Sequence, residues 1–218
     1  MNINKHLILL FSVLFFLFAV SVSSGCFRKN ESDVKSVVRN ELDQLKNLDS
    51  ETTQKYIPYT ELFPDATENT DLTDEINKTF SLFFRKFNYK ISDVIVGTTN
   101  HSATVSVKLT TIDSKVLARD FKAELLRTQI TESAQAQKGN IKDSSRSLEA
   151  HYLILNHLLN TNDYDTAETD CNIQLVNTGN DKKEKWKIQR TNSLEDDLVG
   201  GLIACLLYTS DAADELDG

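Results

Sequence analysis

The segment from residue 103 to residue 110 alternates strictly between apolar and hydrophilic side chains, and no other part of the sequence restricts the fold as strongly. One face carries Ala103, Val105, Val107 and Leu109, and the other carries Thr104, Ser106, Lys108 and Thr110. Successive side chains of a strand point to opposite sides, so this strand has one buried face and one solvated face. That pattern is typical of an antiparallel sheet covered on one side.

Three further segments show the same period of two. We expect a strand from Tyr89 to Val96, with an irregularity near Asp93. Two more strands, Asp170–Asn177 and Lys185–Thr191, flank a polar stretch that contains Gly179, and this spacing predicts a hairpin.

Apolar residues three or four apart predict helices elsewhere. The first helix is expected from about Asp33 to Leu48, and a second begins at Thr73. A third helical stretch ends at Lys138-Gly139, and another spans about Ser145 to Asn160. The sequence therefore predicts an α+β fold, with a curved antiparallel sheet of about four strands packed against helices. The order of the strands in space is not readable from the pattern.

Four phenylalanines lie on one face of the second helix, which makes this face a candidate pocket lining. They are Phe80, Phe83, Phe84 and Phe87. Aromatic rings at helical spacing serve more often as core than as a ligand site, so packing of the helix on the sheet is the favoured interpretation.

The N-terminus has the pattern of an export signal. A cation, Lys5, precedes an uncharged apolar run from Leu7 to Val22, which is shorter than the roughly 20 residues needed to span a bilayer. The run leads into Ser23-Ser24-Gly25-Cys26, which resembles the lipobox of bacterial lipoproteins. The resemblance implies cleavage between Gly25 and Cys26 and attachment of diacylglycerol to the Cys26 thiol. An ordinary secretory signal that ends near a cysteine is the alternative.

The last residues resemble one reading frame of a sequencing adapter. We therefore expect four regions: a lipoprotein signal peptide at 1–25, a short tether at 26–32, a single truncated α+β domain at 33–204, and an artefact at 205–218. A genuine C-terminal strand with an acidic tail is the alternative for this last region.

The net charge and the cysteine content argue against nucleic-acid binding and against a reactive thiol. The formal net charge of the chain is -8. Without Lys5 and the tail acids Asp211, Asp214, Glu215 and Asp217 it falls to about -5, which gives no electrostatic basis for binding nucleic acid. Cys171 is then the one cysteine of the domain, and its place on the apolar face of a strand favours a buried hydrophobe over a reactive thiol.

Several segments together resemble a group of uncharacterised lipoproteins of low-GC Gram-positive bacteria, which carry a domain of unknown function. These segments are Phe87-Asn88-Tyr89-Lys90-Ile91, Ala103 to Lys108 leading to Ile112-Asp113, Lys185-Trp186-Lys187-Ile188, and Gly200-Gly201-Leu202. The resemblance implies a cystatin-like cone related to nuclear transport factor 2, in which a curved sheet wraps helices around a pocket. It brings no catalytic residues with it.

The sequence contains no recognisable constellation for catalysis, metal binding or cofactor binding. The histidines His101, His151 and His157 are not spaced as a ligand set, and the acidic run Glu195-Asp196-Asp197 is interpreted as helix-start or solvated charge rather than as catalytic carboxylates. We expect a non-catalytic binding or interaction module on the outer face of the cell membrane. Its partners would be the membrane, through the lipid anchor, and a small apolar ligand or an envelope protein. The alternatives are a hydrolase- or isomerase-like enzyme with an acid in its pocket, and a structural accessory of the envelope.

Overall fold

The computed structural model describes residues 30–57, 62–63, 72–99, 101–136, 147–179 and 184–207. The signal peptide and Cys26 lie outside this range, as do the expected helix stop at Lys138-Gly139 and most of the 205–218 region.

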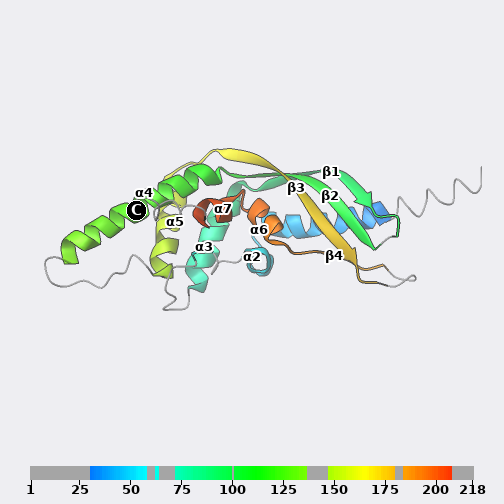
Figure 1. Ribbon diagram of the computed structural model, residues 1–218, viewed down its shortest axis with the longest axis horizontal. Helices are drawn as coiled ribbons and strands as arrows, with labels where there is room; N and C mark the ends of the chain where they lie inside the picture. Colours follow the sequence, from blue (N-terminus) through cyan, green and yellow to red (C-terminus); the bar gives the residue numbers. More distant parts are fainter. Residues whose placement is uncertain are drawn as a thin grey trace, which may run out of the picture.

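An antiparallel sheet of four strands forms one layer of the structure (Figure 1). The strands are β1 (Asn88–Val96), β2 (Ser102–Ile112), β3 (Thr166–Asn177) and β4 (Trp186–Ile188), and they lie side by side in that order. The expected α+β class, with a curved sheet packed against helices, is confirmed. The fourth strand is shorter than the expected Lys185–Thr191, because its ladder with β3 extends only from Leu175 to Asn177.

The two faces of the sheet differ as the alternation predicts. Val105, Val107 and Leu109 of β2 are buried, and their partners across the ladder to β3 include Ile173 and Cys171, which are also buried. The opposite face is solvated and joined by polar pairs between neighbouring strands. These pairs are Thr104 with Gln174 at 2.9 Å, Ser106 with Asn172 at 2.9 Å and Lys108 with Glu168 at 3.1 Å.

The irregularity expected near Asp93 is a β-bulge. The register of β1 against β2 shifts between Ile91 and Asp93, so Ser92 has no partner of its own on β2. Its hydroxyl donates to the carbonyl of Ser106 at 3.0 Å. The extra residue keeps the apolar side chains of β1 on the covered face on both sides of the bulge.

Helices cover the buried face of the sheet and extend beyond one end of it (Figure 1). The first helix is already formed at residue 30, three residues before the expected start, and it continues to residue 46. The others are α2 (Ser50–Tyr56), α3 (Thr73–Phe83), the 3-10 turn η1 (Phe84–Lys86), α4 (Ser114–Ala136), α5 (Leu148–Thr161), α6 (Asn192–Leu198) and α7 (Leu202–Leu207).

These helices pack in a defined order. The helix α3 lies on α5, α4 contacts α5 and α7, and α6 lies against β2 and β3. A buried polar link fixes α3 to α5. The Thr79 hydroxyl shares its proton between the Glu75 carbonyl at 2.8 Å and Oδ1 of Asn156 at 3.0 Å, and Nδ2 of Asn156 donates to the same carbonyl at 3.3 Å. Satisfying both ends of a buried carboxamide specifies one register between the two helices.

Two glycines form the turn between α6 and α7, and both have positive φ, at +62° for Gly200 and +82° for Gly201. Gly200 lies so close to the end of β2 that a Cβ there would be 2.3 Å from Oγ1 of the buried Thr111. The Ser114 hydroxyl donates to the carbonyl of Val199 at 2.6 Å. The glycine pair therefore lets the C-terminal helices close directly over the junction of β2 and α4.

Candidate functional site

The four phenylalanines proposed as a pocket lining form an aromatic cluster. Each is at most 4% exposed, and the ring centroids of Phe84 lie 5.5 Å from Phe83 and 5.3 Å from Phe87. These rings fill space between α3, η1 and the sheet. Only Phe80 also borders an opening to solvent.

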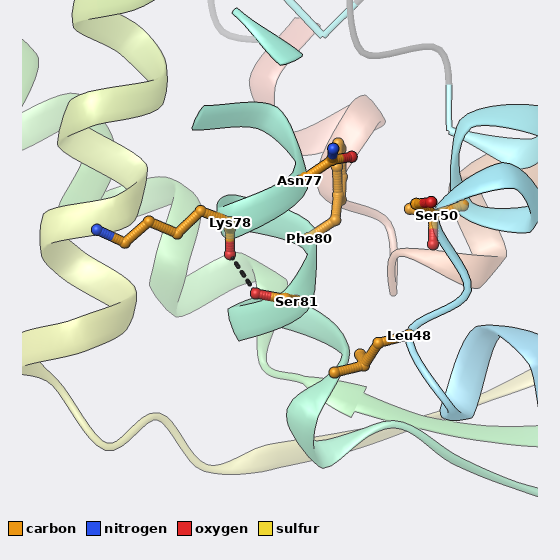
Figure 2. A pocket seen from close by; sticks show the side chains of 7 residues that line it. Leu48, Ser50, Asn77, Lys78, Phe80 and Ser81 are labelled. Atoms are coloured by element: carbon orange, nitrogen blue, oxygen red, sulfur yellow. Dashed lines mark hydrogen bonds between the residues drawn. The ribbon is translucent and has the colours of Figure 1, made fainter. Parts of the chain in front are cut away.

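That opening is a cleft of about 390 Å³ between α2 and α3 (Figure 2). Its size lies in the lower part of the range of small-molecule sites. One wall comes from α3, and the other comes from α2 and from Leu48, two residues before α2 begins. The lining residues are Leu48, Ser50, Thr53, Asn77, Lys78, Phe80 and Ser81.

The wall on the α2 side is held by the end of the first helix. The amide of Asp49 donates to the Gln44 carbonyl at 3.0 Å and that of Leu48 to the Leu45 carbonyl at 3.1 Å, which is the bond pattern of a Schellman motif. The next helix starts at once, because Oδ1 of Asp49 accepts from the amide of Thr52 at 2.8 Å. The hydroxyl of Thr52 also donates to Oε1 of Gln44 at 2.9 Å, which ties α2 to the first helix.

Leu48 occupies the position of this motif that usually holds glycine. Its φ is +62°, and it is the one non-glycine residue with positive φ in the described part of the chain. A left-handed conformation costs an L-residue about 1 kcal/mol or more. Burial of the Leu48 side chain offsets only part of this cost, because 44% of the residue is exposed at the edge of the cleft. Strained backbone of this kind is often found at binding sites.

The polar groups of the cleft differ in whether a hydrogen bond within the protein already occupies them. The Thr53 hydroxyl donates to the carbonyl of Asp49 and the Ser81 hydroxyl to that of Lys78, both at 2.8 Å, so their protons are already used. The carboxamide of Asn77 and the hydroxyl of Ser50 have no hydrogen-bond partner among the described residues.

Among the residues that the structure describes, the lining of the cleft is neutral apart from Lys78. In Figure 2 the side chain of Lys78 runs toward α5, whereas Asn77 and Phe80 point to the α2 side. The ammonium group therefore lies outside the space between the two walls. What remains is an uncharged surface that combines an apolar edge at Leu48 with a free carboxamide at Asn77.

The acidic run at residues 195–197 lies in a short helix, and Glu195 is in the first turn of α6, which agrees with the helix-start interpretation. The alternative of solvated charge is wrong for Glu195. Glu195 is buried and forms an ion pair with Nε of Arg190. Asp196 accepts from the amide of Ala204 at 3.0 Å, and Asp197 lies against the thiol of Cys171. These carboxylates connect α6 to its neighbours, and none of them lines the cleft.

Cys171 has the environment of a buried hydrophobe. Burial, together with the nearby charge of Asp197, raises the pKa of its thiol to about 12. The thiolate, which is the reactive form, is therefore scarce at neutral pH. Burial likewise raises the pKa of the Asp197 carboxyl.

His151 is half-buried on α5 beside the rings of Phe63 and Phe121, with centroid distances of 4.7 Å and 5.7 Å. Its Nδ1 lies 2.8 Å from the carbonyl of Ser147. Burial lowers the pKa of His151, and the bond to this carbonyl opposes the shift. The imidazole acts as a packed ring in this position.

A second hollow of about 420 Å³ lies where the first helix passes the bulge of β1. It is more polar than the cleft and carries charges of both signs. Its lining residues are Glu31, Ser32, Lys35, Ile91, Ser92, Asp93 and Val94.

Sequence reasoning missed the cleft because its members show no shared motif or period. Within the described part of the chain, no cluster of three or more His, Cys, Asp or Glu side chains is placed to hold a metal ion. Among these same residues, no helix is both long and apolar enough to cross a membrane. No family model, curated protein or solved structure matches the chain.

Proposed function

We propose that this protein is a bacterial lipoprotein, anchored through Cys26 to the extracytoplasmic face of the cell membrane, and that its domain is a non-catalytic binding module. The anchor is inferred from the lipobox-like Ser23-Ser24-Gly25-Cys26 after the apolar run. Two acyl chains on one thiol hold a protein on a membrane far better than a single chain. The proposal includes membership in the group of uncharacterised lipoproteins with a cystatin-like domain.

One observation supports the binding role, namely the neutral cleft between α2 and α3. General acid–base catalysis needs an ionisable group within hydrogen-bond reach of the reacting atoms. Within the described ranges, Lys78 is the one ionisable residue that lines this cleft, and its ammonium group points away from it. An uncharged cleft with a free carboxamide and an exposed leucine suits recognition of a ligand better than its chemical conversion.

Lipidation is tested on the native chain in a bacterial host. The protein should fractionate with membranes, and mass spectrometry should find an N-terminus that begins at Cys26 with a diacylglyceryl group. Globomycin, which blocks lipoprotein signal cleavage, should cause the precursor to accumulate. A Cys26→Ser variant is the matched control and should carry no lipid. Recovery of wild-type protein without lipid, or with residues 1–25 retained, would contradict the anchor.

The binding role is tested by crosslinking on intact cells. A photoreactive amino acid at position 81, at the cleft, is compared with one at position 106, on the solvated face of the sheet. If the domain is a binding module, the photoreactive residue at position 81 should give crosslinked adducts that the one at position 106 does not give. Equal labelling from both positions would argue against a specific site there.

A further inference from the structure

Two residues of the cleft, Leu48 and Asn77, indicate which kind of ligand it would hold. This inference rests on the proposed binding role. Leu48 keeps a strained backbone although glycine would fit its motif without strain, and its side chain remains partly exposed at the cleft. An apolar ligand group placed on Leu48 would remove this surface from water. Contact with a ligand therefore accounts for a leucine at a position that the fold alone would leave to glycine.

The free carboxamide of Asn77 supplies the polar half of the recognition. A carboxamide offers a donor and an acceptor side by side, and an extended peptide residue matches both at once, because its own N–H and carbonyl point to the same side of the chain. The N–H and carbonyl of a single trans amide point to opposite sides instead. Asn77 is half-buried, so a ligand that excluded water without pairing it would lose affinity. Among the described residues the walls offer a charged ligand group no countercharge, because the Lys78 ammonium lies outside the space between them.

We infer that the cleft binds a neutral, extended peptide segment, one residue of which pairs its N–H and carbonyl with the side chain of Asn77 while an apolar side chain packs on Leu48. The acetamido group of an N-acetylated sugar is a single trans amide and can make only one of these two bonds at a time. The buried Phe80 also lines the cleft and extends the apolar part of the surface.

The inference is tested with the full-length, membrane-anchored protein in detergent micelles. The two probes are N-acetyl-leucine N-methylamide and N-acetylglucosamine, each titrated while the backbone amide resonances of residues 48–53 and 77–81 are followed by NMR. The controls are an ester of similar size without an N–H for the first probe, and glucose for the second. We expect shifts at the cleft from the peptide probe and none from its ester control, and binding by the sugar probe alone would overturn the assignment to a peptide.

Three variants locate the contacts. Asn77→Ala should weaken binding about fivefold or more, as expected for the loss of a hydrogen bond. Leu48→Gly should weaken binding while raising the urea midpoint of unfolding, because it removes the apolar contact and the backbone strain together. Lys108→Ala, on the solvated face of the sheet and away from the cleft, should leave affinity unchanged.

Several results would overturn the inference. They are saturation by neither amide probe, equal binding of the ester or glucose, or unchanged affinity in both Asn77→Ala and Leu48→Gly. Each of these results is distinct from failure of the proposed function, because lipidation of Cys26 and crosslinking from the cleft are measured independently. Binding that shifts only resonances far from residues 48–53 and 77–81 would agree with a binding module but would show that the ligand does not bind in this cleft.

Discussion

Replacing Gly200 with alanine should be one of the most damaging single-methyl additions in this protein. The residue has φ +62°, which costs an L-residue about 1 kcal/mol. The new Cβ would also lie 2.3 Å from Oγ1 of Thr111 and 3.1 Å from Oγ of Ser114, and both neighbours are buried. Forcing a methyl group into such a packed site costs typically about 2 kcal/mol. We therefore expect Gly200→Ala to lower the free energy of unfolding by about 3 kcal/mol.

Gly201 provides the matched control. Its φ is also positive, at +82°, but a Cβ there would meet nothing within 4 Å. Gly201→Ala should therefore lose only the backbone contribution of about 1 kcal/mol. Urea denaturation followed by circular dichroism would separate the two variants by about 1 M in midpoint, for a slope of about 2 kcal/mol/M.

A double mutant tests the cause of the difference. If the Thr111 hydroxyl is the obstacle, adding Thr111→Ala to Gly200→Ala should recover part of the lost stability, with a coupling of about 1 kcal/mol. Equal losses in Gly200→Ala and Gly201→Ala, or strict additivity with Thr111→Ala, would refute the steric argument.

Two other predictions concern ionisable groups. Because burial lowers the pKa of His151 in the folded state, the unfolded chain binds more protons below about pH 6.5, and stability should fall as pH decreases from there through the folded pKa. Chemical denaturation across pH 5 to 8 should show this dependence of stability on pH in wild type and a smaller one in His151→Gln. Identical slopes in the two proteins would contradict the prediction. Arg190→Gln should lower the free energy of unfolding by about 2 kcal/mol, because it leaves the Glu195 carboxylate, whose side chain is 7% exposed, without its partner. The Arg190→Gln/Glu195→Gln double variant should recover part of this loss, and a double variant no more stable than the single one would argue against the ion pair as the cause.

The strands of the sheet were predictable because the alternation of side chains within each strand can be recognised without knowledge of its neighbours. Alternation places Val105 and Val107 on one face whatever their partners are, and the break near Asp93 follows from the spacing of apolar residues on either side. Strand order depends instead on which edges meet in space. No residue of β2 indicates from the sequence that its second neighbour is β3, which follows it only after two helices.

The short helices and the cleft were not predictable for a related reason. The helices α2, α6 and α7 have only six or seven residues, which is too few turns to show a periodic stripe. The burial of Glu195 depends on Arg190 and on the packing of α6 against the sheet, so the sequence could not decide between helix-start and solvated charge for the acidic run. Asn77 likewise gains its candidate role only because α2 lies opposite it.

The way the chain leaves and re-enters the sheet has a consequence for folding kinetics. The strand β2 ends at Ile112 and β3 begins at Thr166, and the amide of Asp113 donates to the carbonyl of Asp165 at 2.9 Å, so residues 113–165 depart and return at one point. The hairpins β1–β2 and β3–β4 close over short loops, whereas the central β2–β3 ladder must first overcome the closure entropy of a long excursion. We therefore expect the pairing of β2 with β3, rather than the closure of either hairpin, to limit the rate at which this domain folds.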